Sequence, residues 1–299
     1  MSVASIAKLE NRSLVCLSGE DAFAFLQNLV TNDLKLLEKT QSIYSALLTP
    51  QGKFLHDFII SKKEKALYLD CPASRKDDLI KRLTMYKLRA KVDIQDVTAD
   101  LDLYALFGDT AQALATSYHD QQGAQEDKSS LLFADPRLPQ LGYRFYCPVT
   151  AAQPDFFSSA ARVPFDDYTK FRLSLGVPEG GSDIEPEKNF LLEINFEELN
   201  GVSFSKGCYV GQELTARTKH RAKIRKRLFQ FKSDENISVG DVFKVDGKEA
   251  ATVLSFTAPF GLALTRLDAW EKIEQGAPVS PENIALTKPT YVRLPEHSE

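Results

Sequence analysis

The sequence predicts an α+β fold made of helices and antiparallel strands, with a small antiparallel β-barrel at its C-terminal end. Three observations support this prediction. Short segments of the first 227 residues carry apolar residues at helical spacing. β-prone runs lie next to one another in the same region and are separated by turn residues, which is typical of a meander. After residue 227 the sequence changes to short β-prone runs at close spacing, as in small barrels.

The first hundred residues mix helices and strands without the strict alternation that predicts a parallel sheet. A helix is predicted over residues 20–30, where apolar residues form one face. A second helix follows Ser74, which can cap it, and its apolar spacing continues to Tyr86. Strands are expected over residues 42–49, 54–61, 66–71, 92–97 and 101–107, with a turn at residues 50–53.

The rest of the chain is expected to form a second lobe and the barrel. Residues 119–130 lack apolar periodicity and predict a surface loop. A strand over 142–149 and a helix over 166–175 should follow, and the Gly-, Pro- and acid-rich residues 179–188 should cross between lobes. Barrel strands are predicted over residues 228–232, 241–245, 250–256, 262–264 and 291–294. We therefore predict lobes over residues 1–118 and 131–227 and a barrel domain over residues 228–299.

Composition is typical of a globular protein of a reducing compartment. The 299 residues are 43% hydrophobic, which allows a sizeable core. No secretion signal, transit peptide or membrane-spanning run is recognisable, and the four cysteines form no CxxC pair. We therefore expect a bacterial cytoplasm, or the mitochondrial matrix if the source is eukaryotic. The net charge of −4 argues against a general nucleic-acid binder, so neither DNA nor a membrane is expected as a partner, and RNA is disfavoured.

The segment 206–217 places one thiol, Cys208, between two glycines and among cations. A thiol acts as nucleophile or metal ligand only as thiolate, which nearby cations favour. Gly207 and Gly211 free the backbone and allow another molecule to approach. Residues from Gln212 onward predict a helix with Glu213 near its positive end. The other three cysteines lie in apolar runs typical of buried strands, at Cys16, Cys71 and Cys147.

Two further features leave alternatives open. Residues 206–227 contain eight cations and one acidic residue, which fits either a solvated face or a binding surface for an anionic ligand or an acidic partner. His220 lies in this stretch, close enough in sequence to support Cys208. The pair His56–Asp57 could relay a proton in a cleft, or His56 could face water on an edge strand, which spacing alone slightly favours.

The run from Asn200 to Arg217 closely resembles the signature of the folate-binding YgfZ family, which is related to the T-protein (aminomethyltransferase) of the glycine cleavage system and acts in iron–sulfur cluster assembly or repair. The resemblance extends to residues 26–33, 49–53, 176–180, 193–195 and 224–228, which look like the branch that includes the mitochondrial iron–sulfur assembly factor. It implies lobes arranged around a central folate cavity and a C-terminal barrel. We assign the binding of tetrahydrofolate or a derivative to Lys206, Tyr209, Gln212, Glu213, Arg217, Asn32, Asp57 and Asn195.

The sequence departs from the T-protein pattern at two places. The T-protein has two adjacent aspartates where this chain has His56–Asp57, and a glutamate where this chain has Ser174. The resemblance therefore argues against aminomethyl transfer and leaves a gap beside the pterin. Asn195 or Glu193 could supply the polar group that Ser174 lacks.

Three functional hypotheses follow. In the leading one the chain binds tetrahydrofolate and assists iron–sulfur assembly, and Cys208 is a redox-active thiol or a ligand of a transient cluster. One cysteine cannot complete a cluster site, so an A-type scaffold protein or a client iron–sulfur enzyme would supply the other ligands. The alternative is a folate-dependent aminomethyltransferase that uses Asp57 and His56. The third is a non-catalytic module whose residues 219–227 bind RNA or an acidic protein.

Overall fold

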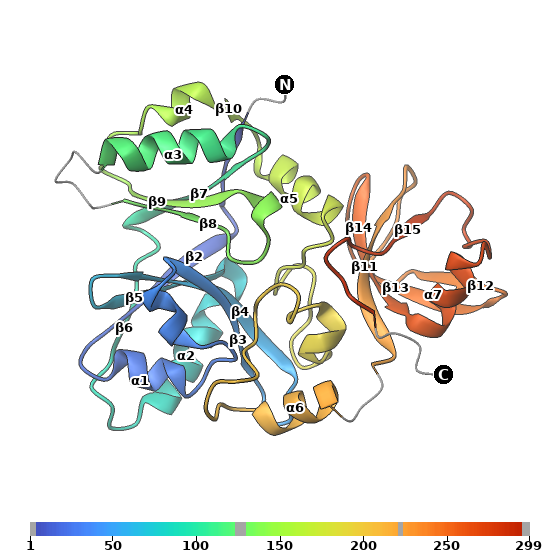
Figure 1. The fold of residues 1–299 in the computed structure, drawn as a ribbon, viewed down its shortest axis with the longest axis horizontal. Coiled ribbons are helices and arrows are strands. Elements are labelled where there is room, and N and C mark those ends of the chain that lie inside the picture. The colour runs from blue at the N-terminus through green and yellow to red at the C-terminus, as the bar shows by residue number, and fades with distance from the viewer. Residues whose placement is uncertain (1–3, 123–129, 221–223, 295–299) are drawn as a thin grey trace.

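The computed structural model describes residues 4–122, 130–220 and 224–294, and these contain three five-stranded sheets. Figure 1 shows the two N-terminal sheets stacked one above the other and the third sheet to one side, with α5 (Phe165–Ser174) between the upper sheet and the third. The α+β class with a C-terminal antiparallel barrel-like sheet is confirmed. The exact domain boundaries remain a prediction.

The lower sheet contains the predicted meander. Its order is β3-β4-β5-β2-β6, and every pair is antiparallel. α1 and α2 cover its outer face, where their apolar residues join the core of the sheet. The helix after Ser74 is confirmed, but its N-cap is Arg75 and no side chain caps it, because Ser74 lies within a preceding 3-10 turn. The elements are α1 (Ala22–Gln27), α2 (Lys76–Lys87), β2 (Arg12–Ser18), β3 (Ser42–Leu48), β4 (Phe54–Lys63), β5 (Ala66–Pro72) and β6 (Asp93–Asp96).

The upper sheet has the order β10-β1-β7-β9-β8, in which only the short β1–β10 pair is parallel. α3 and α4 pack on its outer face through an aromatic core. The predicted surface loop at 119–130 is partly wrong, because residues 119–122 continue α3, whose Tyr118 is buried; residues 123–129 lie outside the described ranges. The elements are β1 (Ser5–Lys8), β7 (Leu101–Phe107), α3 (Ala111–Gln122), β8 (Leu131–Ala134), β9 (Tyr143–Pro148), α4 (Phe156–Ser159) and β10 (Ala161–Arg162).

The third sheet has the order β12-β13-β14-β11-β15 and curls around a core of its own that contains Trp270. Four of the five predicted strands are present. The predicted strand over 291–294 is wrong: this segment is irregular, although Val292 is buried in the core. The fifth strand is β15, and the helix α7 was not predicted. The elements are β11 (Lys226–Lys232), β12 (Val242–Val245), β13 (Lys248–Thr257), β14 (Phe260–Arg266), α7 (Leu267–Glu274) and β15 (Ala285–Thr287).

The junction of the two N-terminal sheets holds a buried charged cluster, here called the arginine–carboxylate cluster. Each member is at most 6% exposed: Arg12, Arg137, Arg144 and Arg172, with Asp70, Asp135, Glu179 and Asp183. Arg137 is bidentate to Asp135, with Nη2 at 2.8 Å and Nε at 3.0 Å, and Arg172 Nη1 lies 2.5 Å from Asp183 Oδ2. Four guanidinium groups reach Glu179 at 3.5 to 3.9 Å. The crossing loop predicted at 179–188 thus supplies two of the buried counter-charges.

None of the described helices is long and apolar enough to cross a membrane.

Candidate functional site

Cys208 is exposed at the surface, on the irregular segment that leads into α6 (Gln212–His220). The other cysteines behave as their apolar runs predict, since Cys71 and Cys147 are buried and Cys16 is half-buried. Burial raises the pKa of the Cys71 thiol to about 12, which keeps it protonated and unreactive at neutral pH. Cys208 is therefore the most accessible of the four cysteines.

Lys206 fixes the segment on the N-terminal side of Cys208. Its ammonium is turned inward and donates to three backbone carbonyl oxygens at and after the end of α1: Gln27 at 2.7 Å, Val30 at 2.5 Å and Asn32 at 2.8 Å. The side chain is buried, and burial lowers the pKa of Lys206 to about 8. The three ammonium protons of Lys206 are therefore already bonded within the chain and are not free for the predicted contact with a folate.

The C-terminal side of the thiol segment is fixed by backbone packing and by Tyr209. Gly211 has φ +81°, and a Cβ there would lie 2.7 Å from the carbonyl oxygen of Thr49, so glycine is required. Tyr209 is 7% exposed and joins the central core, and its hydroxyl bonds Thr215 of α6. Gly207 differs, since it lacks a positive φ and a Cβ would meet nothing within 4 Å. The chain does not need glycine at 207, which leaves open space beside the thiol.

The predicted helix after Gly211 is confirmed as α6, with Glu213 in its first turn. Gln212 is half-buried, whereas Glu213 and Arg217 are exposed. These three predicted folate ligands lie on the helix and do not line the cavity at the junction of the lower and upper sheets. The side chain of His220 lies outside the described part of the structure, so its predicted support of Cys208 stays untested.

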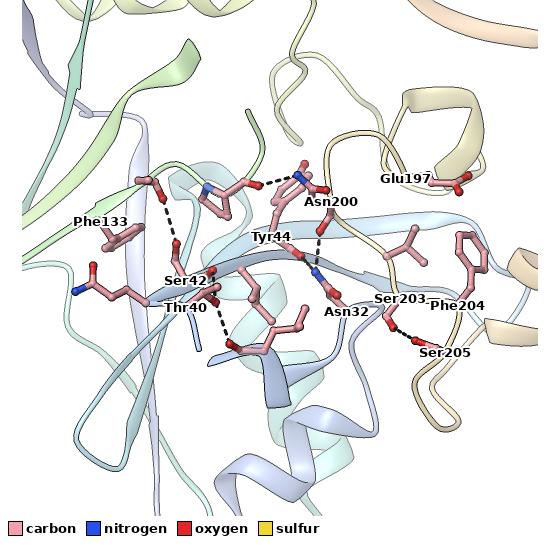
Figure 2. Close-up of a pocket in the computed structure, with 16 residues that line it drawn as sticks. Asn32, Thr40, Ser42, Tyr44, Phe133, Glu197, Asn200, Ser203, Phe204 and Ser205 are labelled. Carbon is pink, nitrogen blue, oxygen red and sulfur yellow. Dashed lines mark hydrogen bonds between the residues drawn. The ribbon is translucent and has the colours of Figure 1, made fainter. Parts of the chain in front are cut away.

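A cavity of about 730 Å³ opens at the junction of the lower and upper sheets (Figure 2). One wall is the segment 200–205, which runs directly into Lys206 and Cys208. Tyr44 of β3 and Phe133 of β8 line it but are each 1% exposed, whereas Phe204 is half-buried. The amides of Asn32 and Asn200 lie beside Tyr44, on the side away from Phe133, and Asn32 Nδ2 donates to the Asn200 carbonyl at 2.7 Å. Its volume and mixed lining suit a small organic ligand.

Of the eight predicted folate ligands, Asn32 is the one that lines this cavity. Asp57 lies behind Tyr44 and is 1% exposed. Its carboxylate accepts hydrogen bonds from the Tyr44 hydroxyl at 2.9 Å and from the Gly180 backbone N–H at 3.1 Å, and burial raises the pKa of Asp57. Asn195 is fully buried and donates to the carbonyl of Leu228 at 2.8 Å, toward the third sheet. The cavity therefore does not bring the predicted set together.

Ser174, which stands where the T-protein has a glutamate, and its two predicted substitutes all form hydrogen bonds within the chain. Ser174 donates to the carbonyl of Phe171 at 2.7 Å. Glu193 accepts from Phe190 N at 2.8 Å and caps a 3-10 turn, and Asn195 faces the third sheet as described. Neither Glu193 nor Asn195 lines the cavity.

His56 and Asp57 do not form a relay, because adjacent residues on a strand point to opposite faces. His56 is also not at an edge facing water: β4 is paired on both sides, and His56 is 2% exposed. Its Nε2 lies 3.0 Å from Asp78 of α2, and burial together with Arg75 and Arg82 lowers the pKa of His56 to about 4. The histidine is thus a neutral core residue at pH 7.

Metal ligands are not grouped within the described residues: no cluster of three or more His, Cys, Asp or Glu side chains there could hold an ion. A metal centre at Cys208 would need further ligands from another molecule. The sequence reasoning missed Tyr44 and Phe133 as cavity residues, because both read as ordinary strand residues. Asn200 was within reach, since it begins the thiol motif.

Two domain families match the chain. The GCVT N-terminal domain matches residues 4–135, and the CAF17 C-terminal beta-barrel domain matches residues 225–294. Among solved structures, the glycine cleavage system aminomethyltransferase T from Bartonella henselae superposes with a TM-score of 0.77 over 97% of this chain and 87% of that one. At 17% identity this likeness shows the fold alone.

Curated relatives carry a more specific name. The mouse protein "Iron-sulfur cluster assembly factor IBA57, mitochondrial" is 33% identical over 87% of this chain and 76% of its own length. The human protein of that name is 35% identical over 74% of this chain and 64% of its own length. The homolog of Mycosarcoma maydis is 34% identical over 75% of this chain and 56% of its own length. The chain spans about half to three quarters of the length of these curated relatives. By these similarities the chain belongs to the IBA57 family, and it has the fold of the glycine cleavage aminomethyltransferase.

Proposed function

We propose that this chain assists iron–sulfur cluster assembly, and that Cys208 supplies one thiolate to a cluster shared with a cysteine-bearing partner. The relatives are named as iron–sulfur cluster assembly factors, which supports the process. The observation that carries the residue assignment is the exposed thiol on a segment anchored at both ends, by Lys206 and by Gly211. Clusters usually need about four ligands, and no such group exists among the described residues.

The partner that fits this site is an A-type scaffold protein or a client iron–sulfur enzyme with cysteines at its own surface. Open space around Gly207 allows its backbone to come close to Cys208. The compartment is proposed to be reducing, the mitochondrial matrix or a bacterial cytoplasm, because Cys208 must remain a free thiol. The mitochondrial names belong to the relatives.

A folate fits the structure in part, and we propose the cavity beside the thiol segment as its place. The cavity volume of about 730 Å³ and the half-buried ring of Phe204 in its lining suit a flat heterocycle. Asn32 and Asn200 would orient it, although their amide groups already bond within the chain. Asp57 does not line the cavity, so the carboxylate recognition implied by the T-protein resemblance is not available there. When bound, a reduced folate can carry a one-carbon unit.

Folate binding can be tested by narrowing the cavity. Leu36 lines it and is 44% exposed, so Leu36→Trp should fill the entrance without disturbing the core. Met85→Trp, at a position 67% exposed on α2, is the matched control. Titration with tetrahydrofolate should show weaker binding for Leu36→Trp alone. Equal affinity of both variants and wild type would place the ligand elsewhere.

The aminomethyltransferase alternative has weaker support. The fold likeness to the aminomethyltransferase is general, and Asp57 is buried against Tyr44 and Gly180. The third hypothesis, binding of RNA or an acidic protein by the basic stretch 219–227, is also weakened, because two of its cations are paired within the chain. Lys219 pairs with Glu197, and Arg227 is buried and pairs with Glu198. Arg221 and Lys223 lie outside the described residues.

Reconstitution tests the proposed role of the thiol. The chain is mixed with an A-type scaffold protein, iron and sulfide, and the cluster absorbance of the isolated complex is measured. Cys208→Ser should abolish the shared cluster, and Cys16→Ser, which alters a half-buried thiol, should leave it intact. An unchanged cluster in Cys208→Ser would remove Cys208 from the ligand set.

A further inference from the structure

Lys206 places a buried ammonium group two residues before Cys208. Its ammonium has three N–H donors, and the structure supplies three acceptors, the carbonyl oxygens of Gln27, Val30 and Asn32. Carbonyls at the end of a helix lack partners within it and favour a cation. Gln27 is the last residue of α1, so the side chain joins the thiol segment to the end of that helix.

We propose that Lys206 is the positioning residue of Cys208: its ammonium holds the thiol at a fixed place on the body of the protein. Cys208 follows two residues later, and a Cβ added at the intervening Gly207 would meet nothing within 4 Å. Downstream, Tyr209 is buried and Gly211 packs on the turn at Thr49. The thiol is therefore held between two fixed points, of which Lys206 is the one that depends on charge.

The alternative reading of Lys206 is a direct ligand of an anionic cofactor, as the motif resemblance implies. The geometry argues against it, because the ammonium lies 2.5 to 2.8 Å from three carbonyl oxygens and does not line the cavity. A cofactor anion would have to displace these contacts. The centroid of the Tyr209 ring also lies 5.2 Å from Nζ.

Spin labelling of Cys208 tests this positioning. Cys16→Ser is used as background, since Cys71 and Cys147 are buried. We expect an immobile nitroxide spectrum for the otherwise wild-type chain, because Lys206 holds the segment through three carbonyl contacts. Lys206→Met should give a mobile spectrum. Lys53→Met is the matched control, because Lys53 Nζ donates to a single carbonyl, that of Lys188.

An immobile spectrum in Lys206→Met would overturn the proposal. A mobile spectrum with a collapsed fold would be recognised by circular dichroism, and the otherwise wild-type chain would then decide: a mobile nitroxide at its Cys208 also overturns the proposal. The functional consequence rests on the proposed shared cluster. There Lys206→Met should lower cluster affinity roughly tenfold or more, as expected when a group that orients a ligand is lost. Failure of that step alone, with the spectra as expected, would reject the shared cluster and keep the positioning role.

Discussion

Replacing Glu179 by glutamine tests how the arginine–carboxylate cluster holds the two N-terminal sheets together. Glu179 lies 3.5 Å from Arg137 and Arg144, 3.7 Å from Arg172 and 3.9 Å from Arg12, and it is 1% exposed. The pKa of Glu179 is held far below its usual range by these arginines, so it is ionised at neutral pH. Glutamine keeps the shape and removes the charge.

The magnitude follows from what remains. Four buried guanidinium groups would face the carboxylates of Asp70, Asp135 and Asp183, which leaves one buried positive charge without its partner. Removing one partner from a buried ion pair costs about 3–5 kcal/mol. Glu20→Gln is the matched control: it removes a pair with Lys91 whose side chains are 72% and 73% exposed, and exposed pairs contribute about 0–1 kcal/mol.

Urea unfolding followed by circular dichroism measures both free energies. We expect Glu179→Gln to lower the free energy of unfolding by about 3–5 kcal/mol and Glu20→Gln by less than about 1 kcal/mol. Equal effects of the two variants would refute the reasoning, because Glu179 would then behave like a solvated surface charge.

Three further predictions concern single positions. Between pH 6.5 and 4 the unfolded chain protonates His56, while the folded chain keeps it neutral. This difference should cost wild type about 3 kcal/mol of unfolding free energy on acidification, and His56→Asn should show a shallower loss in the same titration. Gly211→Ala should destabilise by about 1–3 kcal/mol in urea unfolding because of its φ of +81° and the Thr49 carbonyl, whereas an effect within about 0.5 kcal/mol would contradict the left-handed turn. Gly207→Ala should leave the free energy of unfolding within about 0.5 kcal/mol of wild type, yet weaken binding of the cysteine-bearing partner, which calorimetry measures. A large loss of stability would show that the position is crowded.

The elements with clear periodicity could be predicted from the sequence. The meander over β3, β4 and β5 and the helices α2, α5 and α6 lie within a few residues of their expected positions. α7 was missed although Leu267, Trp270 and Ile273 recur at helical spacing, because the short strands around it dominated the pattern. β15 has only three residues, too few for a periodic signal.

The charged interior could not be predicted in this way. Arg12, Asp70 and Arg144 sit in strands that read as apolar, and Glu179 and Asp183 come from a loop that reads as polar. Their pairing joins residues up to 167 positions apart, which no local pattern encodes. His56 was misjudged for a related reason: β4 is covered on both faces, so its alternation does not separate core from water.

For the candidate site, the exposed thiol and its helix were predictable from composition around Cys208, because polar residues rarely surround a core cysteine. The inward direction of Lys206 was not, since a lysine beside a thiol reads equally as a ligand of an anion. The cavity next to the segment depends on the approach of two sheets and follows only from the three-dimensional arrangement.

The most direct measurement of the central claim is protection of Cys208 from alkylation in the complex. The chain is reconstituted with an A-type scaffold protein and cluster, treated with iodoacetamide, and digested for mass spectrometry. We predict that Cys208 is protected while the cluster is present and becomes modified after the cluster is removed with a chelator, with Cys71 and Cys147 unmodified in both states because they are buried. Equal alkylation of Cys208 with and without cluster would contradict its role as a ligand.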